Sequence, residues 1–545
     1  MPCGNIRGVR IMHNKTFYSL KYLLIALLLG TVVLPTLWLL GTIRPEHIRA
    51  VLASAQFLPM LTNSLVTALA ATAISVTLSF LLAWLLNRSN IRFKSIFVVL
   101  FTLPMLIPSI SHGMGLVLLL GDNGLLTRLL GLGGSLYGYP GIILGSVLYS
   151  FPVAFLMFQD SFQYEDYTIY EAAQALGLSR WRQFRTVTLP SMRRTMISAI
   201  LAVFTLVFTD YGVPLMTGGT VMTLPVYMYR EVIGMMNFSG GAVVGVILLL
   251  PATAAFLMDL RKSNAGPAVG TVPTPYRISG NRLRDILIYG IFALVLVCLC
   301  LPIFAFVLLG FVKQYPIDLS FSLDTVKKLL SGGIGIYFIN SLAIALLTAL
   351  FGTAASYFAA YATARSKRTL PNKLLHFTSM LPLALPGVVL GLSYVLTFQG
   401  AAFYRSIFIL VLVNIVHFFS SPYLLAYNSL SKLNPNLEDV AQSLGISRMR
   451  TLLRVYIPST RATIVEMYSY FFVNAMITIS AVSFLVSFRT MPLSLMIPQL
   501  ESQSFIEGTA LISLLILGVN LLEKGIAFFV KRSILRQTLR DGNDR

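Results

Sequence analysis

Residue types that could catalyse a reaction are sparse in this chain of 545 residues. It contains no G-x-x-x-x-G-K-[ST] phosphate loop, so it lacks the motif that would cradle the phosphates of ATP. No group of His, Cys and acidic residues has metal-ligand spacing, and no Ser/His/Asp arrangement can be argued from the sequence. We therefore expect no catalytic residue, no metal site and no cofactor bound by this chain.

The remaining chemical candidates are polar side chains inside apolar runs. An ionisable group within a membrane is energetically costly, so it is a functional candidate by default. Asp210 closes one run in FTDYGVPLMTGG, and it either faces a cationic substrate or orders its own loop. A histidine or asparagine among apolar residues more often packs or bonds to a neighbouring helix. The candidate pathway residues are Asp210, His112, His417, Asn474 and Thr478, the last at the position equivalent to Asp210.

These candidates sit in a strongly apolar chain. Hydrophobic residues make up 56% of it and charged residues 11%, against about 25% charged residues in soluble domains. Runs long enough to cross a bilayer recur twelve times. They lie near residues 20–41, 60–86, 95–120, 140–160, 194–216 and 239–260, and again near 286–310, 338–363, 374–397, 405–427, 462–487 and 507–530. The composition predicts an all-α, multi-pass membrane protein.

The net charge of +21 follows the predicted topology. With a cytoplasmic N-terminus, 31 Lys and Arg fall in cytoplasmic segments and nine on the other side. Positive charge accumulates on the cytoplasmic side of membrane proteins, so both termini are predicted to be cytoplasmic. The basic composition thus indicates membrane topology and contact with lipid, and it does not call for nucleic-acid binding.

The twelve runs form two similar halves. NSLVTALAATA at Asn63 matches NSLAIALLTAL at Asn340, and LPMLIP at Leu103 matches LPLALP at Leu381. Each half has an even number of runs, so the repeat is parallel and a pathway is expected between the halves. The predicted units are residues 1–260 and 286–545. Residues 261–285, rich in Gly, Pro and Ser, read as a cytoplasmic linker between them.

The most polar repeat is EAAQALGLSRWRQFRTVTLP, from Glu171 to Pro190. Its second copy, DVAQSLGISRMRTLLRVYIP, runs from Asp439 to Pro458 and has nine identities in twenty positions. In each copy a helical pattern stops at a glycine, Gly177 or Gly445, which permits the left-handed turn that ends a helix. Ser179 or Ser447 can then cap a second short helix. The pattern predicts two short helices that meet at an elbow.

This spacing, in this topological setting, resembles the EAA loop of permease subunits of binding-protein-dependent ABC importers. The resemblance covers nearly the whole chain as two fused units. It implies a place in the bacterial inner membrane and the MetI-like fold, with EAA loops at residues 161–193 and 428–461. It implies that each loop docks on one of two cytoplasmic ATPases, which bind ATP and magnesium, and that an extracytoplasmic binding protein delivers substrate. The implied coupling residues are Glu171, Ala172, Ala173, Gly177, Arg180 and Pro190, and Asp439, Val440, Ala441, Gly445, Arg448 and Pro458. The second copy departs from Glu-Ala-Ala, which suggests two unequal contacts.

One alternative function and the choice of substrate stand next to this resemblance. A secondary transporter driven by an ion gradient would also have twelve spans, but it predicts a basic motif in the loop after the second span of each half. Those loops, RSNIRFK and ARSKRTLPNK, look unremarkable. For the substrate, FTDYGVP and VIGMMNFSGGAVVGVILLLP look most like the ferric iron and 2-aminoethylphosphonate group of permeases, more than thiamine or polyamine permeases. Iron and phosphonate stay unranked.

Overall fold

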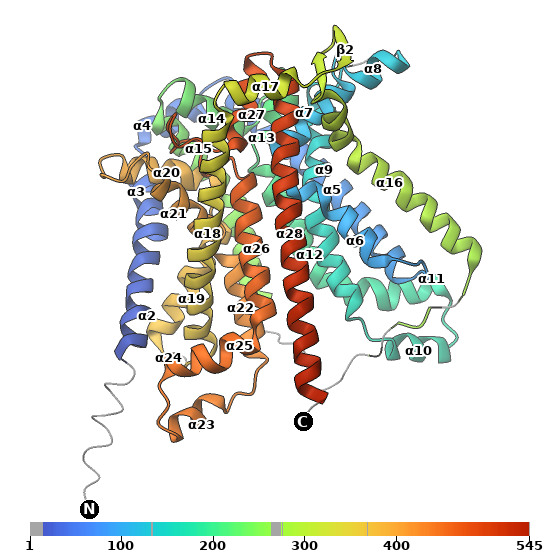
Figure 1. The fold of residues 1–545 in the computed structure, drawn as a ribbon, viewed down its shortest axis with the longest axis vertical. Helices are drawn as coiled ribbons and strands as arrows, with labels where there is room; N and C mark the ends of the chain where they lie inside the picture. Colours follow the sequence, from blue (N-terminus) through green and yellow to red (C-terminus); the bar gives the residue numbers. More distant parts are fainter. Residues whose placement is uncertain are drawn as a thin grey trace, which may run out of the picture.

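The computed structural model describes residues 15–131, 135–262, 274, 276–278, 280–367 and 369–543. Long helices run between two ends of the molecule (Figure 1). We call one the loop end, where α10 (Thr168–Ala175) and α23 (Leu437–Ser443) lie, and the other the hairpin end, where strands β1 and β2 lie. Helix α2 begins at the loop end and helix α28 finishes there. Most of the predicted linker falls outside the described residues.

The first unit contains the elements that match the first six apolar runs. Its helices before the elbow segment are α2 (Lys15–Leu28), η1 (Leu29–Val33), α3 (Leu34–Gly41), α4 (Pro45–Leu52), α5 (Phe57–Asn87), α6 (Lys94–Thr102), η2 (Leu103–Leu106), α7 (Ser109–Leu120), α8 (Leu125–Leu130) and α9 (Tyr139–Gln163). After α10 follow α11 (Arg180–Gln183), η3 (Phe184–Thr188), α12 (Leu189–Phe208), α13 (Gly212–Thr217), α14 (Leu224–Gly234) and α15 (Phe238–Lys262).

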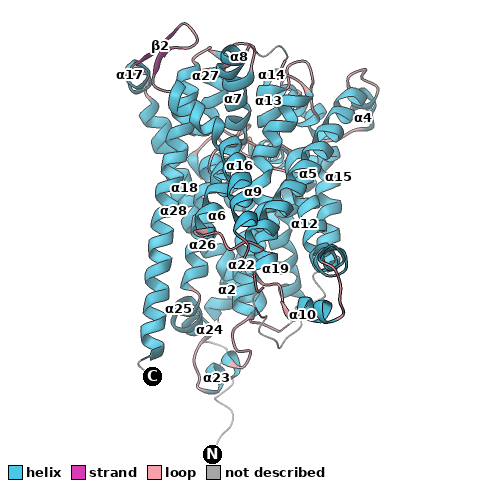
Figure 2. Ribbon diagram, turned by 90° about the vertical axis from the view of Figure 1, so that its right-hand side faces the viewer, coloured by secondary structure: helices cyan, strands magenta, loops and turns pink. Residues whose placement is uncertain are grey.

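The second unit repeats this order with a β-hairpin added near its start. It comprises α16 (Arg282–Leu309), β1 (Val312–Gln314), β2 (Asp318–Phe321), α17 (Asp324–Ser331), α18 (Ile334–Ala364), α19 (Leu370–Met380), η4 (Leu381–Ala384), α20 (Gly387–Phe398), α21 (Ile407–His417) and α22 (Ser420–Ser431). After α23 follow α24 (Arg448–Thr451), η5 (Leu452–Tyr456), α25 (Ile457–Ser459), α26 (Arg461–Ile477), α27 (Leu493–Ser502) and α28 (Ile506–Asn543). Figure 2 shows how strongly helix dominates, with the antiparallel hairpin confined to one end.

The expected all-helical membrane fold is confirmed, with a difference in the form of the spans. Across the described residues, nine helices are long and apolar enough to cross a membrane, and eleven if two bent pairs each count as one span. Proline explains the bending, because it removes a backbone donor and clashes with the preceding turn. The Leu-Pro pairs of the third spans lie in short 3₁₀ turns, η2 and η4, and the chain bends by 112° between η4 and α20. The eleventh expected run, near 462–487, forms a helix of only 17 residues, α26.

The first span of each unit packs on the other unit. Helix α2 lies beside α18 and α19, and α3 lies beside α20 (Figure 1). In the same way, helix α16 of the second unit contacts α6 and α7 of the first unit. Hydrogen bonds join the units in their interior, including the Tyr211 hydroxyl with Ser483 Oγ at 2.5 Å and Asn520 Nδ2 with the Leu106 carbonyl at 2.8 Å. The units are therefore interlocked.

Equivalent side chains also hold equivalent helices. The hydroxyl of Ser64 accepts a hydrogen bond from the Leu224 amide at 2.8 Å, at the start of α14. Ser341 does the same for Leu493 at 2.7 Å, at the start of α27. The first amides of a helix lack intrahelical partners, so these hydroxyls satisfy buried donors. The sequence repeat therefore extends to the contacts within each unit.

Candidate functional site

Both polar repeats fold into the expected elbow, and each lies at the loop end of the molecule. We call residues 164–190 the first elbow segment and residues 432–458 the second. In the first, the Gly177 amide bonds to the Gln174 carbonyl at 2.9 Å and the Leu178 amide to the Ala173 carbonyl at 3.1 Å. Gly177 has a φ of 68°, which glycine adopts without steric cost. This is the Schellman pattern that ends a helix.

The second elbow segment reproduces this geometry. The Gly445 amide bonds to the Gln442 carbonyl at 3.1 Å and the Ile446 amide to the Ala441 carbonyl at 2.8 Å, with a φ of 70° at Gly445. The predicted caps are present too, because Ser179 accepts from the Arg182 amide and Ser447 from the Arg450 amide. Both elbows are therefore held by their own backbone.

The surface of each elbow combines an acid with an exposed leucine. Glu171 and Asp439 are exposed at equivalent places on α10 and α23. Leu176 is 79% exposed and Leu444 is 70% exposed, each directly before its glycine. The same pair of exposed side chains, one acidic and one apolar, therefore recurs on both elbows. Both leucines occupy the same position of the repeated motif, and this identity is visible in the sequence.

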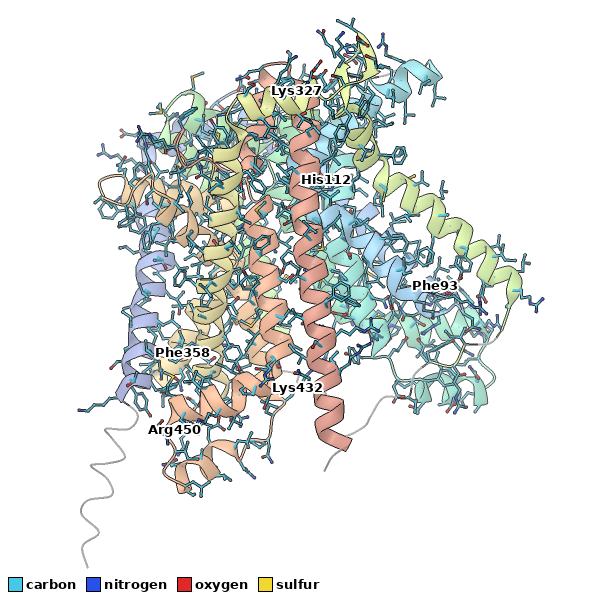
Figure 3. All side chains as sticks on the ribbon, in the orientation of Figure 1. Phe93, His112, Lys327, Phe358, Lys432 and Arg450 are labelled. Atoms are coloured by element: carbon cyan, nitrogen blue, oxygen red, sulfur yellow. The ribbon has the colours of Figure 1, made fainter. Side chains whose placement is uncertain are left out.

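The other motif residues have different environments in the two segments. Ala172 is exposed and Ala173 is buried, whereas Val440 is exposed and Ala441 half-buried. Arg180 is exposed, but Arg448 donates to Ser366 Oγ at 2.6 Å and its guanidinium lies 5.2 Å from the Phe17 ring centre. Pro190 begins α12 and Pro458 lies in α25. Figure 3 shows two cations of the second segment, Lys432 and Arg450, at the loop end.

A buried arginine ties the second elbow segment to α18. Arg365, which follows α18 directly, forms an ion pair with Glu438 of α23, with Nη2 2.6 Å from Oε2 and Nε 2.9 Å from Oε1. Its other donors reach the Leu433 carbonyl at 3.1 Å and the Asn434 carbonyl at 2.6 Å. The Tyr456 hydroxyl of η5 donates to the same carboxylate. One guanidinium thus joins a membrane span to both arms of the elbow.

The first unit has a corresponding cluster built from other positions. Arg88, which follows α5, has Nη2 2.5 Å from Glu165 Oε2 and 3.0 Å from the Tyr170 hydroxyl of α10. That hydroxyl donates to Glu165 at 2.5 Å and lies 2.8 Å from Thr188 Oγ1 of η3. Burial, with the hydrogen bond to Glu165, raises the pKa of Tyr170, so the phenol stays protonated. This cluster ties α5 to α10 and η3.

Aligning the two halves does not reveal these clusters, because the acid and the tyrosine of one cluster stand at different positions from those of the other. The acid stands before α10 in the first unit but within α23 in the second, where Glu438 aligns with Tyr170. The tyrosine of the second cluster, Tyr456, aligns with Thr188. One signal was available: Arg88 and Arg365 follow the repeated Asn63 and Asn340 at the same spacing, in the loops that looked unremarkable.

A cavity of about 420 Å³, lined by apolar side chains with several polar ones among them, lies between the units. Its walls come from α9, α12 and α15 of the first unit and from η4, α20, α22 and α26 of the second. The polar residues that line it are Tyr149, Ser198, Thr205, Thr209, Asp210, His417, Ser420, Ser421, Tyr470 and Ser480. Among the residues that the structure describes, no Lys or Arg lines it. The cavity lies where a parallel repeat predicts the pathway.

Asp210 orders the loop that follows it. Oδ1 accepts from Ser109 Oγ at 2.7 Å, and Oδ2 accepts from the Val213 amide at 3.0 Å, which caps α13. The residue also lines the cavity. His417 lines the same cavity, and its Nδ1 has no hydrogen-bond partner in the part of the chain that the structure describes. Two of the five candidates thus share one cavity.

The other three candidates do not line this cavity. His112 is buried in α7 with Nδ1 3.2 Å from the Pro108 carbonyl, and Figure 3 shows it in the interior. Asn474 donates to the Tyr470 carbonyl of its own helix at 2.8 Å. Thr478 is buried after α26. The cavity instead includes Tyr149 and Tyr470, two phenols that sequence reasoning did not single out. No metal-holding group of three or more His, Cys, Asp or Glu residues is found in the described ranges.

Comparison with known proteins agrees with this architecture. The family model of the binding-protein-dependent transport system inner membrane component matches residues 75–260 and again residues 352–536. Each matched range falls within one of the two units, so the repeat seen in the sequence and in the structure is a repeat of this family's domain. The chain belongs to the family of binding-protein-dependent transport system inner membrane components and carries two copies fused in one polypeptide. Permeases of this family are not enzymes.

Relatives named for iron transport align over most of the chain. A candidate ferric transport system permease protein, FbpB 1, of Haemophilus influenzae is 26% identical over 516 residues, which cover 89% of this chain and 80% of that protein. The ferric transport system permease protein FbpB of Actinobacillus pleuropneumoniae is 26% identical, covering 82% of this chain and 68% of its own. A solved bacterial alginate ABC transporter is 19% identical, covers 45% of this chain and 96% of its own, and has a TM-score of 0.37.

Proposed function

We propose that this chain is the permease of an ATP-driven importer and that its two elbow segments are the EAA loops on which two cytoplasmic ABC ATPases dock. The loop end then faces the cytoplasm, both termini are cytoplasmic, and an extracytoplasmic binding protein delivers substrate at the hairpin end. The units are residues 1–260 and 286–545, joined by a linker at 261–285. ATP and magnesium bind to the partner ATPases.

The observation that carries this proposal is the pair of arginine clusters. Glu171 and Leu176, or Asp439 and Leu444, offer an exposed docking surface on each elbow. Arg88 and Arg365 then connect each elbow to the second span of its unit. An ATPase that displaces α10 or α23 would therefore move α5 or α18 with it, because a buried ion pair cannot part without leaving a charge unpaired. A pair of loops lying passively on the membrane would need no such connection.

We propose a ferric cation as the substrate, in preference to a phosphonate. The relatives named for ferric transport support iron, and so does the charge of the cavity. Asp210 is the one carboxylate among the described residues that line the cavity, and its oxygen atoms and those of Tyr149 and Tyr470 are hard donors of the kind that suit hard cations. An anionic phosphonate would meet a carboxylate there with no Lys or Arg in the lining. The cavity therefore favours a cation in transit.

Uptake into proteoliposomes tests the proposed activity. The permease, reconstituted with its ATPase and a binding protein loaded with ferric iron, should import iron with ATP and stop when ATP is replaced by a non-hydrolysable analogue. A proton or sodium gradient alone should drive no uptake. Uptake that persists without ATP would identify a gradient-driven transporter instead.

The change Asp210→Asn should slow iron import at least about tenfold, which corresponds to about 1.4 kcal/mol of lost interaction with the cation. The amide keeps nearly the same volume and can still accept a hydrogen bond, so α13 should remain capped. Asp122→Asn, which changes an exposed carboxylate in the loop after α7, is the matched control and should import at the wild-type rate. Equal rates for both variants would remove Asp210 from the pathway.

A further inference from the structure

A short part of the chain that leads into α16 lies on the first elbow segment. The Tyr167 amide donates to the Thr274 carbonyl at 3.0 Å. The Thr274 amide and hydroxyl both donate to Asp166 Oδ1, at 3.3 Å and 2.8 Å. Thr274 therefore adds backbone and side-chain bonds to the residues immediately before α10.

Tyr276 covers the buried arginine of the first cluster. The Arg88 guanidinium carbon lies 3.4 Å from the centre of the Tyr276 ring. The same ring makes edge contacts with Tyr167 at 5.0 Å and with Tyr170 at 5.1 Å between ring centres. Arg88 is thus enclosed between its acid, the tyrosines of the elbow and an aromatic ring that belongs to the linker.

The ion pair next to this stack is the weaker contact. Arg277 Nη1 lies 3.6 Å from Glu171 Oε1, and the two side chains are 82% and 50% exposed. Ion pairs in water contribute little, whereas a cation–π contact removed from solvent contributes substantially more. Tyr276 is therefore the anchor, and Arg277 leaves Glu171 open to another partner.

The two arginines differ in the hydrogen-bond partners of their guanidinium groups. Both terminal nitrogens and Nε of Arg365 have hydrogen-bond partners, two of them carbonyls of its own elbow segment. Arg88 Nη1 has no hydrogen-bond partner among the residues that the structure describes. The stacked ring of Tyr276 takes the place of the missing carbonyls. The two clusters are thus completed differently, one from within its unit and one by the linker.

We propose that Thr274 and Tyr276 form a brace that holds the first elbow segment against α5, so that the linker is a working part of the first ATPase-docking surface. The contacts of Thr274 and Tyr276 described above support the brace itself. Only its effect on ATPase docking rests on the proposed function. The two docking surfaces are then unequal: one depends on the fused linker and the other on its own backbone.

Hydrogen exchange of the full-length permease in nanodiscs, without ATPase, tests the brace. In Tyr276→Ala, amides of residues 165–176 should exchange about tenfold faster, while residues 434–444 keep the wild-type rate. Tyr276→Phe, which retains the ring, should behave as wild type. Tyr164→Ala, which removes a 72% exposed tyrosine of the same loop, is the control and should change nothing. Unchanged exchange at 165–176 in Tyr276→Ala, or equal acceleration in both segments, would overturn the proposal.

Two additions keep the test decisive. If Tyr276→Ala does not fold, Thr274→Val removes the hydroxyl bond to Asp166 and should accelerate exchange at 165–176 in the same direction, so unchanged exchange there would overturn the brace. Addition of the ATPase should protect both segments of the wild type, but only residues 434–444 of Tyr276→Ala; equal protection of both segments in the variant would show that the linker plays no part in docking. Absence of protection in the wild type would refute docking at the elbows, whereas the ATPase-free result would still decide whether the brace exists.

Discussion

Replacing Arg365 by methionine should detach the second elbow segment from α18 and reduce ATP-driven uptake to a small fraction of the wild-type rate. The substitution removes the donor of the Leu433 and Asn434 carbonyls. It also leaves Glu438 without its guanidinium partner, although the Tyr456 hydroxyl still donates to it, in a partly buried site. Breaking one partner of a buried pair costs about 3–5 kcal/mol. Uptake and hydrogen exchange at residues 434–444 should therefore change together, with faster exchange at the elbow.

A double variant separates the ion pair from a general defect. Arg365→Met with Glu438→Leu removes both charges, and replacing a buried pair by apolar groups is often neutral for stability. The double variant should unfold at a higher temperature than Arg365→Met alone. Lys367 is an exposed cation two residues away, and Lys367→Met should match the wild type in uptake and in hydrogen exchange at residues 434–444. Normal uptake by Arg365→Met would show that this cluster does not transmit movement.

Proline at the elbow glycines should abolish ATP-driven uptake while the protein still inserts in the membrane. Proline fixes φ near −65°, whereas Gly177 and Gly445 have φ values of 68° and 70°. It also removes the amide that closes each Schellman turn. Alanine keeps that amide and costs only about 1–2 kcal/mol in the left-handed region, so Gly177→Ala and Gly445→Ala should retain part of the activity.

The control for these variants is a glycine with the same backbone at the hairpin end. Gly131 has a φ of 60°, ends the short helix α8 and has open space around it. Gly131→Pro imposes similar strain away from both elbows, so its uptake should stay close to the wild-type rate. Normal uptake in both Gly177→Pro and Gly445→Pro would contradict coupling through the elbows.

The parts of the fold that follow from local chemistry could be predicted from the sequence. Apolar runs longer than a bilayer require helices, and the two glycines within a helical pattern require left-handed turns. The Leu-Pro pairs of the third spans indicate local breaks as well, because proline lacks a backbone donor and clashes with the preceding turn. The twelve spans were less accurate, because α26 is shorter than its apolar run and two spans are bent pairs.

The parts that depend on tertiary contact could not be predicted in the same way. Arg88 and Arg365 acquire their role from acids that stand at non-equivalent positions, Glu165 and Glu438, so an alignment of the halves conceals the pairing. The two explanations of Asp210 were treated as exclusive, yet one carboxylate both caps α13 and lines the cavity. His112 Nδ1 lies 3.2 Å from the Pro108 carbonyl, and the residue does not line that cavity. A single sequence carries no information on such directions.

The central claim is that both elbow segments receive an ATPase, and cross-linking from the exposed leucines tests it most directly. In chains whose native cysteines are replaced by serine, Leu176→Cys and Leu444→Cys should each form a cross-linked product with the ATPase in the assembled complex. Lys327→Cys, at the hairpin end (Figure 3), should form none. Products from both elbow positions would support the account. An assembled complex that cross-links from neither elbow position would contradict it.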